Sequence, residues 1–224
     1  MIHELIESEF RNEWYRTIGK NEISKAILED VIARYNEHHR HYHDLSHIWM
    51  CIEEQKALKL EQSDSLKLYL SSAFHDIVYS TRQDDKWNVL FSADYGRVKA
   101  TVLGLDKKIA EEVHDQVIVT SHRTPPRTLL EQYRVDLDLV IFGKEAETFG
   151  EYNQNIRKEY LWIPEQTYRE KRLVVLTHFA SKEHIYYTGH FRRLYEGKAR
   201  HNLRKEIERM CSLQTTSKNM LVLN

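Results

Sequence analysis

Apolar residues recur through most of this chain at the three- and four-residue intervals that place them on one face of an α-helix. Between residues 22 and 38, for example, Ile23, Ile27, Val31 and Tyr35 form one stripe. The alternation typical of strands is almost absent. The pattern predicts an all-α fold, with helices over residues 2–18, 22–38, 64–79, 85–103, 107–121, 152–164, 168–179 and 191–210, and one more that starts near Asp44 or Ser46 and ends near Gln55.

Polar residues and prolines mark where these helices stop. Gly19-Lys20-Asn21 is typical of one helix ending and another beginning, and Pro125-Pro126 predicts a break. No repeat or Gly/Ser-rich linker divides the chain, so we expect a single domain over residues 1–211. The Ser/Thr-rich residues 212–224 predict a loosely ordered C-terminal tail.

A histidine and an aspartate interrupt one of the apolar helical patterns, in the run from Ser72 to Tyr79. A buried carboxylate is costly unless a positive charge compensates it. A divalent cation bound by His75 and Asp76 would remove that cost, because imidazole and carboxylate are both good metal ligands. Alternatively, His75 is a neutral core residue and Asp76 faces solvent, since adjacent helix residues point about 100° apart. For an isolated His-Asp pair we favour this second interpretation.

Histidines are concentrated upstream of that pair, five of them between residues 38 and 47. His47 lies beside an apolar stripe, where an imidazole needs a partner. His43 shares a helix face with His47 only if the helix includes both residues. The remaining three are interpreted as surface residues or substrate contacts: His38, His39 and His41.

Acidic residues enter a second apolar run, from Val135 to Phe142. One of Asp136 and Asp138 is expected to be exposed or to cap a helix, and the other is a candidate metal ligand. Two histidines and two aspartates would give mixed nitrogen and oxygen coordination with positions left for water. Such coordination suits a catalytic site better than a closed structural one.

Composition and charge exclude several other classes. Of the 224 residues 41% are hydrophobic and 30% charged, and the formal net charge of −1 gives no basic surface typical of nucleic-acid or anionic-membrane binding. Two cysteines, Cys51 and Cys211, are too few for a disulfide framework. Neither a signal peptide nor a membrane-spanning apolar run is present. These features predict a cytoplasmic protein without nucleic-acid or membrane partners.

The order His47, His75-Asp76 and Asp138 resembles the HD superfamily of metal-dependent phosphohydrolases, and the chain looks most like the family of predicted HD-superfamily metal-dependent hydrolases. The resemblance covers roughly residues 10–208. One departure concerns a glutamate that this family often shows after its HD helix, where the present chain has Val89. The matching stretches are Arg40 to Ile48, Phe74 to Tyr79, Asp136 to Gly143, Asn155 to Tyr160, and Glu196 to Asn202.

The resemblance implies an HD-domain helical bundle with flanking helices. It further implies one divalent metal ion held by His47, His75, Asp76 and Asp138, with Asp138 preferred over Asp136. Asp76 is then also a catalytic residue that accepts a proton from water. His122 occupies a position where some HD enzymes place an additional histidine, so we assign it a catalytic role. Three further residues are expected to bind the substrate: Arg40, His43 and Arg157.

The function implied by the resemblance is metal-dependent hydrolysis of a small phosphorylated or nucleotide substrate. One alternative is a regulatory module that binds metal or nucleotide without turnover, and a less favoured one is a di-iron oxidative enzyme. His and Asp ligands accept Mn, Mg, Fe, Co, Ni or Zn, so the sequence does not select the metal. Asn155, Arg157 and Tyr160, with Glu196, Arg200 and Asn202, could instead form a structural polar network between the last helices. The four tryptophans fill a core or an oligomer interface equally well.

Overall fold

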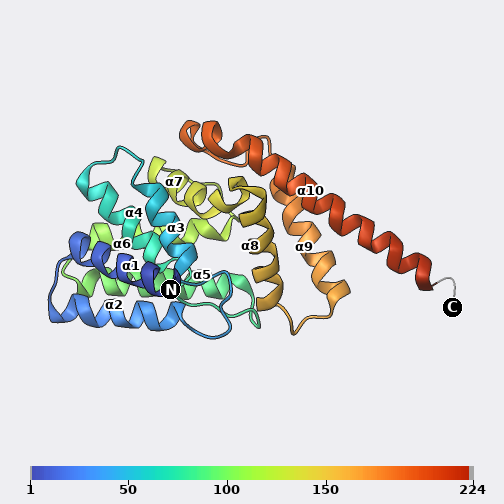
Figure 1. Ribbon diagram of the computed structural model, residues 1–224. Helices are drawn as coiled ribbons and strands as arrows, with labels where there is room; N and C mark the ends of the chain where they lie inside the picture. Colours follow the sequence, from blue (N-terminus) through green and yellow to red (C-terminus); the bar gives the residue numbers. More distant parts are fainter. Residues whose placement is uncertain (1, 222–224) are drawn as a thin grey trace. The chain divides into compact units, whose positions relative to one another are not determined.

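The computed structural model describes residues 2–221, with side chains over residues 2–212 (Figure 1). All regular structure in this part of the chain is helical, which confirms the predicted all-α class. None of these helices is both long enough and apolar enough to cross a bilayer. The α-helices are α1 (Ile2–Ile18), α2 (Glu22–Tyr35), α3 (Leu45–Gln55), α4 (Gln62–Phe74), α5 (Asp85–Val102), α6 (Lys107–Ile118), α7 (Leu129–Asp138), α8 (Ala146–Glu159), α9 (Glu165–Ala180) and α10 (Gly189–Leu221), and the 3-10 helices are η1 (Val119–Ser121) and η2 (Leu139–Gly143).

The chain divides into two compact units, Met1–Asp138 and Leu139–Asn224. The first unit contains α1 to α7, and the second contains α8 to α10. A single domain over residues 1–211 stays a prediction, and so does the helical arrangement of an HD domain. Helix α10 runs to Leu221. A loosely ordered tail is predicted for residues 212–224. Almost all of the side chains in this range lie outside the described residues, so the tail also stays a prediction.

The core of the first unit forms around Trp14 of α1, which is fully buried. Its indole Nε1 donates a hydrogen bond to Ser24 Oγ at 2.9 Å, so the one polar atom of the ring is satisfied. The Trp14 ring centroid lies 6.2 Å from those of Phe10, Tyr69 and Phe74. Three of the four residues in the stripe predicted for the second helix are buried, namely Ile27, Val31 and Tyr35.

Side-chain caps start the helices that position the site. Asn21 caps α2 by accepting a hydrogen bond from Ser24 N, and Gly19, at φ +92°, ends α1, as the Gly-Lys-Asn signal predicts. Of the two candidate caps for α3, Asp44 is the one used, and its carboxylate accepts from Ser46 N and His47 N. Helix α3 therefore begins at Leu45, and His43 lies outside it.

Helix α4 ends at Phe74, earlier than the end predicted at residue 79. Just beyond this end lies Arg40, whose Nη1 donates to the Asp76 carbonyl at 2.7 Å and whose Nη2 donates to the Ile77 carbonyl at 3.0 Å. Because the guanidinium satisfies these carbonyls, the chain can leave the helix at His75 without burying unpaired backbone groups. The objection that His75 and Asp76 point apart on a helix therefore does not apply.

In the second unit, polar side chains of α10 form hydrogen bonds with the backbone of segments that precede this helix. The Glu196 carboxylate accepts hydrogen bonds from Ile185 N at 3.1 Å and Tyr186 N at 3.3 Å, and pairs with Arg200 at 2.7 Å. Asn202 donates to the carbonyls of Phe142 and Lys144, both at 2.9 Å. These contacts give Glu196, Arg200 and Asn202 the structural role considered for them from the sequence.

Gly143 ends η2 at a close approach to α10. A Cβ added there would lie 2.5 Å from Tyr195 Cβ and 3.0 Å from the Tyr186 hydroxyl. We expect Gly143→Ala to lower the free energy of unfolding by about 1–3 kcal/mol, because the backbone must shift to admit the methyl group. Urea denaturation measures this loss. Gly197→Ala on α10 is the matched control, since its Cβ meets nothing within 4 Å. That control is expected to be stabilised by up to about 1 kcal/mol, and equal behaviour of the two variants would contradict the steric account.

Candidate metal centre

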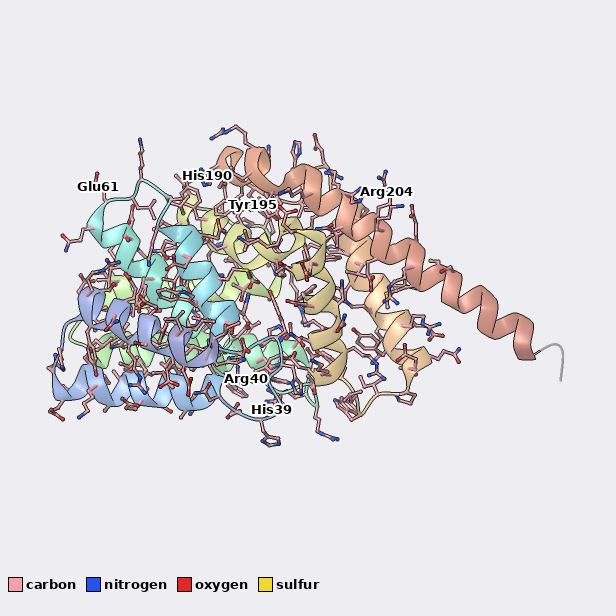
Figure 2. The ribbon with its side chains drawn as sticks, in the orientation of Figure 1. His39, Arg40, Glu61, His190, Tyr195 and Arg204 are labelled. Atoms are coloured by element: carbon pink, nitrogen blue, oxygen red, sulfur yellow. The ribbon has the colours of Figure 1, made fainter. Side chains whose placement is uncertain are left out.

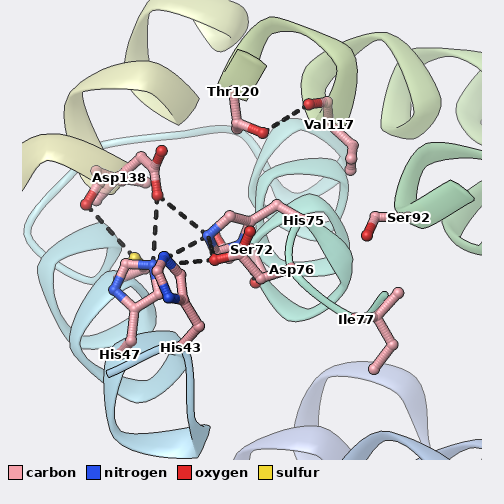
Figure 3. Close-up of polar contacts among 12 residues, drawn as sticks. His43, His47, Ser72, His75, Asp76, Ile77, Ser92, Val117, Thr120 and Asp138 are labelled. Carbon is pink, nitrogen blue, oxygen red and sulfur yellow. Dashed lines mark hydrogen bonds and ion pairs between the residues drawn. The ribbon is translucent and has the colours of Figure 1, made fainter. Parts of the chain in front are cut away.

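Four donor residues of the first unit converge on one point (Figure 3). His47 lies in the first turn of α3, His75 caps the C-terminus of α4, Asp76 follows it, and Asp138 is the last residue of α7. One ligand atom from each lies within 4.8 Å of all the others. The two imidazoles face each other with their Nε2 atoms 3.1 Å apart. Residues separated by up to 91 positions in sequence thus form one cluster.

The distances between these atoms fit a small divalent cation. Asp138 Oδ1 lies 3.1 Å from His75 Nε2 and 3.3 Å from His47 Nε2. Asp76 Oδ2 lies 3.1 Å from His75 Nε2 and 3.6 Å from His47 Nε2. Ligands about 2.1 Å from one cation, at octahedral or tetrahedral angles, are about 3.0–3.4 Å apart. The donor set, two imidazoles and two carboxylates, could therefore hold one divalent metal ion without large rearrangement.

The hydrogen bond on the far side of His75 supports this use. His75 Nδ1 donates to the Ser72 carbonyl at 2.9 Å, which leaves Nε2 directed at the cluster (Figure 3). Such a backbone carbonyl behind a ligating histidine fixes the ring orientation and the tautomer. His47 differs, because its buried Nδ1 has no hydrogen-bond partner among the described residues.

Charges within the cluster shift the pKa values of its members. Burial lowers the pKa of His75, but the carboxylates of Asp76 and Asp138 outweigh it and raise the pKa to about 9. Burial raises the pKa of Asp76, yet the charge of His75 and its hydrogen bond hold that pKa well below the usual range. Burial lowers the pKa of His47. The two carboxylates thus favour a positive charge at this point, and a divalent metal ion would supply such a charge.

Arg134 of α7 is a fully buried cation beside the cluster. Its Nη1 donates to Ser72 Oγ, its Nη2 donates to Cys51 Sγ at 3.5 Å, and Nη2 lies 3.9 Å from Asp138 Oδ1. The guanidinium therefore contacts three parts of the site. These are Ser72, whose carbonyl orients His75, Cys51, which lies on the same helix as His47, and the Asp138 carboxylate. Sequence analysis did not identify Arg134, although its position four residues before Asp138 places both on one helix face.

The two aspartates of α7 have different environments. Asp138 belongs to the donor cluster, whereas Asp136 is fully buried and is not part of it. The expectation that one of the two would be exposed or would cap a helix is wrong, because the residue outside the cluster lies in the core. On α7, residues two positions apart point in different directions, so only one of the two carboxylates can face the histidines.

His122 also reaches the cluster, from the end of η1. Its Nε2 lies 3.1 Å from Asp138 Oδ2, opposite the oxygen that faces His47 and His75. His122 adopts φ +54°, the only positive φ of a non-glycine residue in the described part of the chain. Non-glycine residues are uncommon in this region, and strained backbone concentrates at functional sites. The predicted catalytic histidine is thus held next to a predicted metal ligand.

The backbone at His122 makes a matched pair of variants informative. We expect His122→Gly to unfold with a free energy about 1 kcal/mol higher than that of His122→Ala, because glycine adopts positive φ without the Cβ penalty. Both variants lose the hydrogen bond to Asp138, so their difference reports the backbone alone. Thermal or urea denaturation of the two proteins gives this difference. A His122→Ala protein as stable as His122→Gly would contradict the backbone account.

The predicted substrate contacts in the first unit lie beside the cluster. Arg40 is buried, and its guanidinium also donates to the Glu37 carboxylate at 3.0 Å and to the His43 carbonyl at 3.1 Å. These bonds give Arg40 a positioning role toward the backbone of Asp76, and its contact with substrate stays a prediction. His43 lies against Tyr79, with ring centroids 4.3 Å apart, and 6.0 Å from the ring of His47.

Three other basic residues form ion pairs of their own. Lys86 and Arg123 both pair with Asp84 at the surface, at 3.7 and 3.1 Å. Arg157 belongs to the second unit, where it donates to Glu165 at 2.8 Å and to the Tyr160 carbonyl at 2.6 Å. Its predicted role as a substrate contact of the metal centre therefore stays a prediction.

Comparisons of the chain with protein-family models, with curated proteins and with solved structures found no match. The resemblance to the HD superfamily therefore rests on the residues that carry it, and it stays a prediction.

Proposed function

We propose that the chain is a metal-dependent phosphohydrolase of the HD superfamily that acts on a small phosphorylated or nucleotide substrate. The observation that carries this proposal is the convergence of His47, His75, Asp76 and Asp138, with donor atoms within 4.8 Å of one another. The order of these residues along the chain matches the superfamily pattern, which links the cluster to phosphate ester hydrolysis. A bound divalent ion would lower the pKa of a water molecule and polarise a phosphoryl oxygen.

The exposure of the cluster suggests where a substrate approaches. The side chains of His47 and His75 are only 2% and 0% exposed, whereas those of Asp76, Asp138 and His122 are 19%, 15% and 18% exposed. The imidazole ligands therefore form the floor of the site, and the carboxylates and His122 form its open side. We assign the substrate to this open side.

Hydrolysis joins the oxygen of water to phosphorus, breaks the ester P–O bond and transfers a water proton to the leaving oxygen. Asp76, on the open side, is positioned to accept the proton from water. His122 can carry a proton to the leaving oxygen, because a neighbouring imidazole is an effective proton donor and acceptor. Its hydrogen bond to Asp138 holds the ring beside the cluster. His43, whose ring lies against Tyr79, is a second imidazole of the first unit that we assign to contacts with phosphate oxygens.

One group of donors supports one metal ion per chain. Within the described residues, His47, His75, Asp76 and Asp138 are the one group of three or more His, Cys, Asp or Glu that could hold an ion. A di-iron oxidative enzyme needs more ligands than this group provides. Val89 favours the other alternative, a binding module without turnover. Its side chain is apolar and buried, so this position supplies no carboxylate to the site.

Phosphate release tests the proposal. The full chain, loaded with Mn²⁺, Co²⁺ or Mg²⁺, is incubated with phosphomonoesters and with nucleoside mono-, di- and triphosphates. We expect turnover of at least one substrate class, and its loss in Asp76→Asn, which preserves side-chain shape. Full metal occupancy with no release from any substrate would overturn hydrolysis in favour of the binding module. Two irons per chain would overturn it in favour of oxidative chemistry.

A further inference from the structure

The second unit contains a cavity of about 560 Å³ between α8, α9 and α10, separate in sequence from every donor of the metal centre. Its size falls in the range of small-molecule sites, about 300–1,000 Å³. Three arginines line it, one from each helix: Arg157, Arg169 and Arg209. Two glutamates, Glu165 and Glu206, also line it. The lining therefore carries one more positive than negative charge.

The whole second unit is basic. Residues 139–224 contain 15 Lys and Arg against 10 Asp and Glu, while residues 1–138 contain 18 against 24. The formal net charge of −1 for the chain is thus the sum of +5 for the second unit and −6 for the first unit. Such a field favours an anionic ligand in the second unit, and a concave wall concentrates the field.

The arginines of the cavity form ion pairs with glutamate carboxylates, and a bound anion could take the place of such a carboxylate. Glu165 accepts from Arg157 Nε at 2.8 Å and lies 3.4 Å from Arg169 Nη2, and its side chain is 58% exposed. Glu206 accepts from Arg209 Nε and Nη2 at 2.8 and 2.7 Å. The exposed Glu165 carboxylate is screened by solvent, and such pairs contribute only about 0–1 kcal/mol, so exchanging it for another anion costs little. The Glu206 side chain is only 11% exposed, but its partner Arg209 is 58% exposed and stays accessible to an anion.

The same arginines differ in how freely they can bind a ligand. Arg157 is tied by the Tyr160 carbonyl and stacks over the Tyr168 ring, 4.7 Å from its centroid, so it forms a fixed wall. Among the residues whose side chains the structure describes, Arg169 and Arg209 bond only glutamate side chains. The planar guanidinium fork matches the oxygens of a phosphate group, and two forks from different helices can grip one group.

From this geometry we propose that the cavity binds the phosphate group of a small phosphorylated molecule through Arg169 and Arg209. Tyr168 and Arg157 form the wall against which the rest of the molecule lies. A cavity of about 560 Å³ holds much more than free phosphate, which is why the ligand is a phosphorylated molecule and not the inorganic ion. The site needs neither a metal ion nor hydrolysis, so it stands apart from the function proposed for the first unit.

Calorimetric titration of the metal-free full chain with inorganic phosphate and with pyrophosphate tests this site. We expect one pyrophosphate per chain, bound more tightly than phosphate, at low ionic strength where charge screening is weak. Arg169→Gln and Arg209→Gln should each weaken pyrophosphate binding about 10-fold or more. Glu165→Gln should tighten it, because the competing carboxylate is removed while the side-chain shape is kept. A purely structural role for these residues would not produce that opposite sign.

Two controls separate this site from general charge and from the metal centre. Arg204 is exposed on the same helix and points away from α9 in Figure 2, so Arg204→Gln should bind pyrophosphate as the parent chain does. Asp76→Ala should also bind it normally, since Asp76 belongs to the metal cluster. No binding to the parent chain, or equal weakening by Arg204→Gln and Arg209→Gln, would overturn the proposal. Loss of binding in Asp76→Ala would also overturn it, by assigning the phosphate to the first unit.

Discussion

Asp76→Ala and His75→Ala are each expected to lower the affinity of the chain for a divalent metal ion by roughly two orders of magnitude or more. The reason is geometric: each substitution removes one of four donors whose atoms lie within 4.8 Å of one another. Both residues follow the end of α4, so helix content should stay close to that of the parent chain. Elemental analysis of protein purified without chelator or nickel resin, together with Mn²⁺ titration and far-ultraviolet circular dichroism, measures both effects.

The chain offers a matched control for these variants. His114 and Asp115 form a second adjacent His-Asp pair, on α6, with His114 Nδ1 3.2 Å from Asp115 Oδ1. Asp115 is exposed, and neither residue belongs to the donor cluster. His114→Ala and Asp115→Ala should therefore retain full metal content. Full metal content in the His75 and Asp76 variants would contradict the assignment of the metal centre. Equal loss of metal in the His114 and Asp115 variants would contradict it as well.

Arg134→Met is expected to cost about 3–5 kcal/mol of the free energy of unfolding, the range seen when one partner of a buried charged network is removed. Arg134 is fully buried and donates to Ser72 Oγ and Cys51 Sγ. Methionine fills much of the volume, but it removes the donor to Ser72 Oγ and the positive charge 3.9 Å from Asp138, whereas Cys51 Sγ keeps its hydrogen bond to the Leu137 carbonyl. Urea denaturation of the metal-free protein gives the loss.

Added Mn²⁺ tests whether the loss is electrostatic. A divalent ion bound by the cluster supplies positive charge beside Asp138, so Mn²⁺ should stabilise Arg134→Met by more than it stabilises the parent chain. Arg123→Met is the control, because Arg123 pairs with Asp84 at the surface and both side chains are about half exposed. Its stability should change by no more than about 0.5 kcal/mol. An Arg134→Met protein as stable as this control would refute the network.

Local signals were sufficient for much of the fold. Helical spacing of apolar residues predicted the all-α class, and the stop at Gly19-Lys20-Asn21 and the cap at Asp44 follow from local backbone chemistry. The sequence predicted that this helix would run to residue 79, but α4 ends at Phe74, and Arg40, more than 30 residues upstream, binds the Asp76 and Ile77 carbonyls just beyond that end. Long-range hydrogen bonds leave no trace in local periodicity.

By itself, the sequence determined the residue types that could hold a metal ion and predicted the helix that carries His47, but it predicted no helix for Asp138, which ends α7, and it placed His75 and Asp76 inside a helix that ends before them. It contains three adjacent His-Asp pairs, at 43–44, 75–76 and 114–115, and spacing alone does not distinguish them. Only the tertiary structure decided that His75-Asp76 meets His47 and Asp138, that Asp136 is buried outside the cluster, and that Arg134 lies beside the cluster. The physical reason is that sequence patterns report neighbours within a few helical turns, whereas these donors come from three helices whose convergence depends on how the core packs.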